Sequence, residues 1–185
     1  MEAIKQLRLC ARTVSDVPDL FVNPNEEESG EPKIWVKGWF PVLFGLSRII
    51  TRCKMDVRTR ALTVMFEVMK TYGETFLSQW WTDLFRVVFR IFDSKKLHDM
   101  NTQQERVEWM STTCTHALRS IIDVVSQFFG TLENCVVVDL FVLISWCIQQ
   151  ENEQLARAGT ECLHILVMNN GAEFADETWE LAVNT

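Results

Sequence analysis

The sequence predicts an all-α fold in which two-helix repeats stack into a solenoid, and three observations support this prediction. Apolar residues recur every three or four positions along most of the 185 residues, as they do on the buried face of a helix. Seven Gly and four Pro are too few for a chain of many tight turns, and twelve Phe and seven Trp suit wide helix-packing layers. Helix pairs of about 40 residues follow one another along the chain.

The predicted elements divide residues 1–185 into parts of a single helical-repeat segment. Residues 1–33 are predicted to form a short helix and an acidic connector, which is either a solvated loop or an acidic docking arm. About three antiparallel helix pairs and the start of a further helix follow: 34–73, 75–130, 132–171 and 172–185. The partial repeats at both ends indicate a segment of a longer solenoid, whose apolar end faces neighbouring repeats would cover.

The second helix of the first pair, residues 56–72, has the clearest pattern. Two apolar rows run along it: Val57, Ala61, Val64, Met65, Val68 and Tyr72, then Leu62, Phe66 and Met69. A helix with so wide an apolar surface needs more than one neighbour. Asp56 is predicted to cap this helix and Gly73 to end it. Pro41 lies near the start of the preceding helix, where a missing N–H is tolerated.

The middle pair contains large aromatic residues and a capping signal. Residues 76–92 show an apolar face that Leu77 widens. Thr102 and Glu105 have the spacing of a capping box. The next helix is predicted to end at Gly130, with one apolar face: Val107, Met110, Cys114, Leu118, Ile121, Val125 and Phe128.

The third pair is predicted from an apolar helix over 132–150 and a return helix from about residue 151, whose apolar face is Leu155, Ala158, Cys162, Ile165 and Leu166. Part of this return helix, RAGTECL at 157–163, can be laid over RALTVMF at 60–66. Asp or Asn before the second helix of a pair, and Arg within it, are typical of HEAT or armadillo-type repeats. We therefore expect a HEAT/armadillo-like solenoid.

Charge and composition argue against several classes of partner. Eighteen Lys and Arg face 25 Asp and Glu, a net charge of -7, so general attraction to nucleic acid or anionic lipid is not expected. The longest apolar run, 136–148, is shorter than the about 20 residues of a membrane span. Six cysteines without paired spacing, and no secretory leader, indicate reduced thiols in a cytoplasmic protein.

Catalytic and metal-binding patterns are not found in the sequence. It contains no GxSxG, Walker or GxGxxG motif. Cys114 and His116 recur as Cys162 and His164, but residues two apart point about 200° apart around a helix and cannot share one metal. The third histidine, His98, lies in a polar connection. We therefore predict no catalytic, cofactor-binding or metal-binding residue.

Three features allow both a functional and a structural interpretation, and we favour the structural one for each. Asp139 is either a buried functional carboxylate or a residue facing a groove or an arginine. Trp80 and Trp81 are either an interface hot spot or core residues. Five arginines either form a recognition ridge or bond to acidic side chains and turn carbonyls of the adjacent repeat: Arg58, Arg60, Arg86, Arg90 and Arg157.

Three long strings carry a family resemblance: GWFPVLFGLSRIITRCKMDVRTRALTVMFEVMKTYG at 38–73, QWWTDLFRVVFRIFD at 79–93 and QQENEQLARAGTECL at 149–163. They resemble the large brefeldin A-inhibited guanine nucleotide-exchange proteins for Arf GTPases, in the region downstream of the catalytic exchange domain. The resemblance covers essentially the whole chain. It implies a factor of Golgi vesicle traffic, cytoplasmic and peripherally associated with trans-Golgi membranes. It also implies that exchange belongs to another domain, so no glutamate of this chain inherits the catalytic role.

The resemblance leads to two main hypotheses. In the first, the chain is a non-catalytic regulatory module that binds neighbouring domains of its own chain and small GTPases of the Arf family, but not nucleic acid. Such binding is expected to be lost in surface variants such as Arg86→Glu. In the alternative, the chain is a purely architectural spacer with intramolecular contacts alone. Direct contact with Golgi lipid is a third possibility, which the acidic net charge opposes. The partner-binding residues are not predicted.

Overall fold

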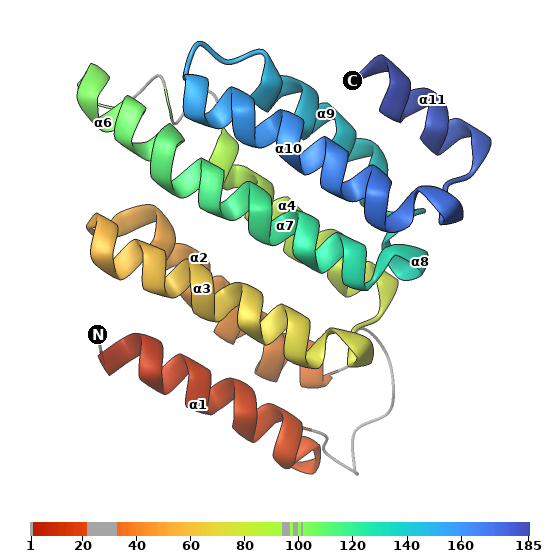
Figure 1. Ribbon diagram of the computed structural model, residues 1–185. Helices are drawn as coiled ribbons and strands as arrows, with labels where there is room; N and C mark the ends of the chain where they lie inside the picture. The colour runs from red at the N-terminus through yellow and green to blue at the C-terminus, as the bar shows by residue number, and fades with distance from the viewer. Residues whose placement is uncertain (1, 22–32, 94–96, 98–99, 101) are drawn as a thin grey trace. The chain divides into compact units, whose positions relative to one another are not determined.

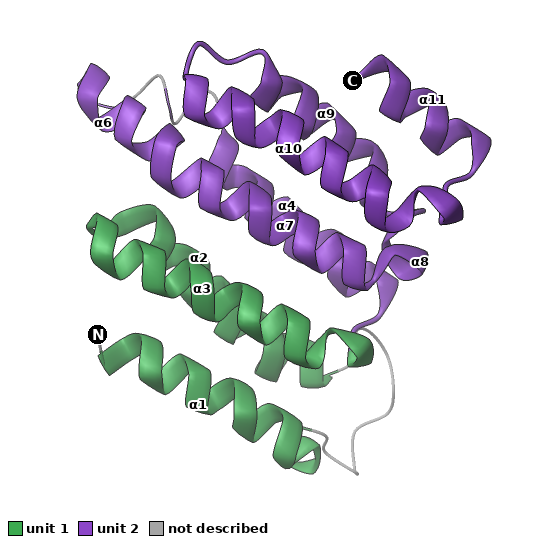
Figure 2. Ribbon diagram, in the orientation of Figure 1, with its two compact units in different colours: residues 1–75 green, residues 76–185 purple. Residues whose placement is uncertain are grey.

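A computed structural model describes residues 2–21, 33–93, 97, 100 and 102–185. The regular elements within these residues are all helical, which confirms the predicted all-α class (Figure 1). They form two compact units, Met1–Thr75 and Phe76–Thr185 (Figure 2). The HEAT/armadillo-like repeat and the antiparallel pairing stay predictions. Among the described helices, none is both long and apolar enough to cross a membrane.

Unit 1 is built around α3, which packs against both α1 and α2. Its elements, with η denoting a 3-10 or π-helical segment, are α1 (Glu2–Asp16), η1 (Pro18–Phe21), η2 (Ile34–Trp39), α2 (Phe40–Arg52), α3 (Met55–Tyr72) and η3 (Gly73–Thr75). The two predicted rows of α3 are buried except for the half-buried Val57 and Tyr72. Two neighbours therefore cover its wide apolar surface, as expected.

Pro41 lies in the first turn of α2, as predicted, but α2 continues directly from the preceding helical segment η2. The preceding segment η2 is a π-helix, and the N–H of Phe40 donates to the carbonyl of Trp35, five residues earlier. This wider turn allows the chain to continue into α2, although Pro41 has no N–H to donate. Gly38 of η2 packs closely against α1. A Cβ at this position would lie 2.9 Å from Cγ1 of Val14, so only glycine fits without a shift of Val14.

The prediction that Asp56 caps α3 was wrong. The helix begins at Met55, and Lys54 occupies the N-cap position with extended backbone angles and no side-chain cap hydrogen bond. Asp56 therefore lies in the first helical turn, where its negative charge complements the positive end of the helix dipole. Gly73 follows the last residue of α3, as predicted.

Unit 2 is organised around α10, which packs against α7 and α9. Its elements are α4 (Ser78–Phe89), η4 (Arg90–Phe92), α6 (Gln103–Glu108), η5 (Trp109–Cys114), α7 (Thr115–Gln127), α8 (Phe129–Leu132), α9 (Val137–Ile148), α10 (Glu153–Asn170), η6 (Gly171–Glu173) and α11 (Asp176–Asn184). Trp80 and Trp81 are buried, and the Trp81 ring lies 5.2 Å from the Phe128 ring between centroids. The favoured core interpretation of this pair is confirmed.

The helical segment 103–127 contains a π-helical turn, η5, which the sequence pattern did not reveal. The hydroxyl of Thr102 accepts the N–H of Glu105 at 3.1 Å, which is the Thr102 half of the predicted capping box. Val107 was predicted to be buried but is 45% exposed. A π turn adds a residue, which rotates the preceding turn by about 100° relative to the rest of the helix. The Nε atom of Arg106 is buried beside it instead.

Four further boundary or burial predictions were wrong. Gly130 does not end the long helix, which stops at Gln127 because Phe128 leaves the helical conformation. The apolar helix begins at Val137 rather than at residue 132, after the short α8 and a turn. Leu77 is exposed because it precedes the first turn of α4, and Ile165 of α10 is 41% exposed.

Candidate functional site

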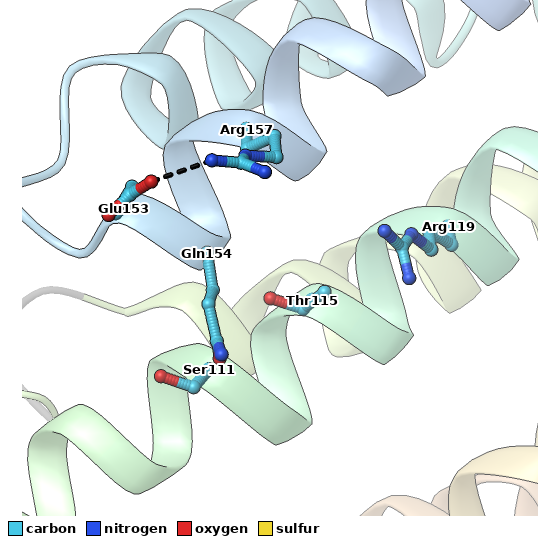
Figure 3. Close-up of a pocket in the computed structure, with 6 residues that line it drawn as sticks. All are labelled: Ser111, Thr115, Arg119, Glu153, Gln154 and Arg157. Atoms are coloured by element: carbon cyan, nitrogen blue, oxygen red, sulfur yellow. Dashed lines mark hydrogen bonds and ion pairs between the residues drawn. The ribbon is translucent and has the colours of Figure 1, made fainter.

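A polar groove of about 510 Å³ lies between α10 and the segment formed by η5 and α7 (Figure 3). Its lining side chains carry hydroxyl, amide, carboxylate and guanidinium groups: Ser111, Thr115, Arg119, Glu153, Gln154 and Arg157. Figure 3 shows Gln154 extending from α10 toward Ser111. Such a set of donors and acceptors on rigid helices can hydrogen-bond the polar surface of another protein.

Small and medium side chains allow the helices beneath the groove to approach closely. Ala158 and Cys162 of α10 are at most 1% exposed. A Cβ on Gly159 would lie 2.9 Å from Cγ1 of Ile148 and 3.1 Å from its backbone N, so α10 and the end of α9 are in close contact. This packing holds α10 in a fixed position and therefore fixes one wall of the groove.

Asn152 connects the two walls of the groove. Its Oδ1 accepts the N–H of Leu155 at 3.0 Å, which caps α10, and its Nδ2 donates to the Ser111 hydroxyl at 2.9 Å. The sequence pattern indicated that an Asp or Asn commonly precedes the second helix of such a pair, and Asn152 has this position. It did not indicate the contact with Ser111, because the two residues are 41 positions apart.

The π turn positions the other wall. The hydroxyl of Thr115 donates to the carbonyl of Met110 at 3.1 Å, and its N–H donates to the same carbonyl. The indole N–H of the buried Trp109 donates to the carbonyl of Ile91 at 2.9 Å. These bonds satisfy backbone carbonyls in and beside the wide turn. Ser111 and Thr115 are four residues apart on this segment, and both line the groove.

Two exposed ion pairs border the groove. A guanidinium N–H of Arg119 donates to Glu161 at 2.8 Å across the helices, and one of Arg157 donates to Glu153 at 2.6 Å within α10. Exposed pairs of this kind contribute about 0.2–1 kcal/mol each to stability. Each guanidinium has five N–H donors, so these arginines can also bind carboxylates of a partner.

The five predicted arginines are not gathered into one site. Arg157 lines this groove, whereas Arg60 lines a groove in unit 1. Arg58 donates to the Cys53 carbonyl at 3.3 Å, and Arg86 pairs with Asp83 at 3.1 Å. The expected acidic and carbonyl partners are thus present for Arg58, Arg86 and Arg157. The described partners of Arg86 and Arg157 lie on the same helix as the arginine, and the Cys53 carbonyl lies in the turn before the helix of Arg58.

The remaining candidate residues occupy unremarkable positions or lie outside the described residues. Asp139 is exposed in the first turn of α9, so it is not a buried functional carboxylate. His164 is exposed, and burial lowers the pKa of the half-buried His116. His98 and the acidic run 25–31 are outside the described part of the chain.

The cysteines show no arrangement for metal binding. Cys114 and Cys162 are fully buried, and burial raises the pKa of Cys162 to about 12. A raised pKa means a protonated thiol, which is a poor metal ligand and a poor nucleophile. Among the described residues, no group of three or more His, Cys, Asp or Glu is placed to hold a metal ion.

A second groove, of about 320 Å³, lies between α1 and α3 in unit 1. Arg8 of α1 and Glu67 of α3 form an ion pair that joins its two sides. The described residues that line it are Ile4, Lys5, Arg8, Thr59, Arg60, Thr63, Val64 and Glu67.

Comparison with known proteins shows similarity along the whole chain. Brefeldin A-inhibited guanine nucleotide-exchange protein 1 of mouse and of human is 52% identical over 187 residues, which cover 100% of this chain and 10% of the relative. ADP-ribosylation factor guanine nucleotide-exchange factor SEC7 of Saccharomyces cerevisiae is 31% identical over 192 residues, covering 97% of this chain and 10% of the relative. The chain thus spans about a tenth of the length of these relatives. No family model matches the chain, and no solved structure matches it.

Proposed function

The chain belongs, as a segment, to the family of large brefeldin A-inhibited guanine nucleotide-exchange proteins, and on this premise we propose that it is a non-catalytic regulatory module that binds other proteins. The observation that carries the proposal is the 52% identity over the whole chain to proteins about ten times its length. The module acts in Golgi vesicle traffic, and the nucleotide-exchange reaction takes place elsewhere in the full-length protein.

The groove between α7 and α10 is the surface on which we place partner binding. A stable interface buries about 800 Å² on each partner, and arginine is enriched in such interfaces. Arg119 and Arg157 supply guanidinium groups on rigid helices, and Gln154 and Ser111 supply polar groups of smaller size. The proposed partner is an Arf-family GTPase or a neighbouring domain of the same polypeptide, because the relatives are named for exchange on ADP-ribosylation factors. A HEAT-like stack would present this groove between successive repeats.

Binding by variant chains tests this placement. The purified chain is titrated with an Arf-family GTPase loaded with a GTP or a GDP analogue, and we expect tighter binding of the GTP form. The double variant Arg119→Glu/Arg157→Glu should bind at least about tenfold more weakly, because both charges of the groove are reversed. The sequence alone suggested Arg86→Glu as a disruptive change, but Arg86 of α4 pairs with Asp83 and does not line the groove, so Arg86→Glu is now the control. The same loss in Arg86→Glu as in the double variant would overturn the placement.

The architectural alternative has its own supporting observation. Met168 of α10 is 70% exposed, and Val183 and Trp179 of α11 are 80% and 40% exposed. Apolar side chains exposed in this way are typical of surfaces that another element covers. If the chain is only a spacer, it will self-associate in sedimentation experiments and will bind no GTPase. Measurable GTPase binding by a monomeric chain would exclude that account.

A further inference from the structure

A stripe of basic and apolar side chains is exposed along the continuous helical segment formed by η2 and α2. Every exposed residue of this segment is either basic or apolar, and together these residues form the α2 stripe: Val36, Lys37, Pro41, Phe44, Arg48 and Arg52. Residues 33–55 contain five Lys or Arg and no Asp or Glu, and the nearest acidic residues in the sequence are Glu31 and Asp56. The exposed charges of this helix are therefore positive, although the net charge of the whole chain is -7.

The residues of the α2 stripe share one side of the helix. Pro41, Phe44, Arg48 and Arg52 follow one another at steps of three and four residues, and the two stripe residues of η2 lie one turn earlier. The ring of the half-buried Phe40 stacks on the Phe44 ring with 5.7 Å between centroids. The guanidinium carbon of Arg48 lies 5.9 Å from the centre of the Phe44 ring. Aromatic and cationic side chains on successive turns thus contact one another along the stripe.

Both kinds of side chain in the stripe are accessible to a partner. Val36 is 50% exposed and Phe44 is 38% exposed. Lys37, Arg48 and Arg52 are exposed, and within the described part of the chain none of the three forms an ion pair with an acidic residue. A partner can therefore reach these apolar surfaces and positive charges without first breaking an internal ion pair.

We propose that the α2 stripe docks an acidic amphipathic helix of another protein. Carboxylates of the partner pair with Lys37, Arg48 and Arg52, and its apolar side chains pack on Val36 and Phe44. From Val36 to Arg52 the stripe extends about 24 Å, which equals about four turns of a bound helix. The inference is independent of the proposed GTPase binding, because the stripe lies in unit 1 and the groove lined by Arg119 and Arg157 lies in unit 2.

A single helix suits the stripe better than a broad anionic surface does. A helix is about 10 Å wide with its side chains, so it can contact the stripe alone. A membrane or a long nucleic acid also approaches the rest of the molecule, and residues 76–185 contain fifteen Asp or Glu against seven Lys or Arg. Such a surface is repelled by the negative net charge, whereas a narrow partner responds mainly to charges within the Debye length of about 8 Å.

A fluorescence-anisotropy titration of the whole chain tests this proposal. The probe is a fluorescein-labelled peptide of three Leu-Glu-Ala-Ala-Leu-Glu-Glu repeats, in which an acidic row lies beside an apolar row when the peptide is helical. The charge control is the same peptide with Lys in place of Glu. We expect the acidic peptide to bind at least about tenfold more tightly than the control, and its affinity to fall as salt is raised to about 0.3 M.

Three results of this titration would overturn the proposal. The first is absence of binding by the acidic peptide, and the second is equal binding of the two peptides. The third is binding of single-stranded RNA, or of vesicles of phosphatidylcholine and phosphatidylserine, by a chain that does not bind the acidic peptide.

A matched pair of lysine variants locates the binding. Lys37→Glu should weaken binding of the acidic peptide about fivefold, whereas Lys5→Glu should change it less than about twofold. Both lysines are exposed in unit 1, and both variants make the same change in charge, but only Lys37 belongs to the α2 stripe. Arg52→Gln, which removes one charge without reversing it, should also weaken binding, and Val36→Ser should do so by removing apolar contact. Equal effects of Lys37→Glu and Lys5→Glu, in chains with unchanged circular dichroism, would place the peptide elsewhere and refute the proposal.

Discussion

Asn152 joins two segments that are far apart in the sequence. Its Oδ1 caps α10 by accepting the Leu155 N–H, and its Nδ2 holds Ser111 on the π turn. Removal of this side chain leaves a helix N–H and a hydroxyl without these partners, which costs more than the loss of a solvent-exposed bond. The residue therefore fixes both the start of a helix and the width of the groove.

The first prediction concerns this cap. Asn152→Ala is expected to lower the free energy of unfolding by about 1–2 kcal/mol, as measured by urea denaturation. Lys54→Ala is the matched control, because Lys54 occupies the N-cap position of α3 without a side-chain cap hydrogen bond, and its effect should stay within about 0.5 kcal/mol. Equal losses in the two variants would show that the cap contributes nothing specific.

The second prediction concerns thiol reactivity. Cys10 is exposed, whereas Cys114, Cys147 and Cys162 are buried. Burial raises the pKa of Cys147 and Cys162, so the reactive thiolate is scarce in the folded chain. Alkylation of the native protein followed by mass spectrometry should modify Cys10 first and the three buried thiols only after denaturant is added. Rapid native labelling of Cys162 would contradict the packing described for α10.

The third prediction concerns pH. Burial lowers the pKa of His116 below its ordinary value of 6.5, so at acidic pH the unfolded chain binds this proton more readily than the folded chain. The stability associated with a neutral His116 is therefore complete above pH 6.5 and is lost as the pH falls through the folded-state pKa. His116→Gln should reduce the loss of stability between about pH 7 and about pH 5, measured by urea titration. An unchanged pH dependence would contradict this assignment.

At the scale of elements, the contact between α9 and α10 depends on Gly159 of α10, which has no side chain. Gly159→Ala would favour the helix intrinsically by about 1 kcal/mol. However, the new Cβ would lie 2.9 Å from Cγ1 of Ile148 and 3.1 Å from its backbone N. We expect a net destabilisation of about 1–3 kcal/mol in thermal or urea unfolding, because backbone cannot move aside as a flexible side chain can.

Gly130 provides the comparison for this fourth prediction. A Cβ at Gly130 meets no atom within 4 Å, and the residue lies in the short helix α8. Gly130→Ala should therefore be neutral or stabilise the fold by up to about 1 kcal/mol. If Gly159→Ala proves as mild as Gly130→Ala, α9 and α10 are not packed as closely as described.

Helical periodicity predicted most of the buried faces but not the changes of helix type. The rows of α3 could be predicted because a regular α-helix keeps one phase from Ala61 to Met69. The exposure of Val107 could not be predicted, because the π turn in η5 rotates the helix face before it relative to the face after it. A π turn has no periodic pattern of its own in the sequence. Asp56 has the side chain of a capping residue, yet α3 begins at Met55 and its N-cap is Lys54. The ends of helices are the part of a structure that a sequence pattern locates least well.

The sequence did not predict the candidate groove, because a groove depends on which helices become neighbours. Arg157 was singled out from the sequence, and it does line the groove of unit 2. Arg119 was not, since its partner Glu161 is 42 residues away and only the packing of α7 on α10 brings them together. Ser111 and Gln154 likewise carry no local signal. Polar residues on helix surfaces are common, and a single sequence does not show which of them share a cleft.

At the scale of the whole molecule, each unit has a groove between helices, and most of the acidic excess lies in residues 76–185, which contain seven Lys or Arg and fifteen Asp or Glu. The relatives that share its whole length are about ten times longer and are named as guanine nucleotide-exchange proteins. Charged side chains that line a groove allow it to distinguish different partners, because charge complementarity determines which encounters are productive. This arrangement supports our proposal of a regulatory module that binds without catalysing exchange.

Titration of the purified chain into an Arf-family GTPase loaded with a fluorescent guanine nucleotide tests this claim most directly. Anisotropy of the nucleotide reports binding, and its total fluorescence reports release. Our account predicts a rise in anisotropy, larger for the GTP analogue than for GDP, with no acceleration of release. Accelerated GDP release would show that the chain is catalytic. Unchanged anisotropy with both nucleotides, from a chain shown to be folded by circular dichroism, would contradict its proposed role as a GTPase-binding module.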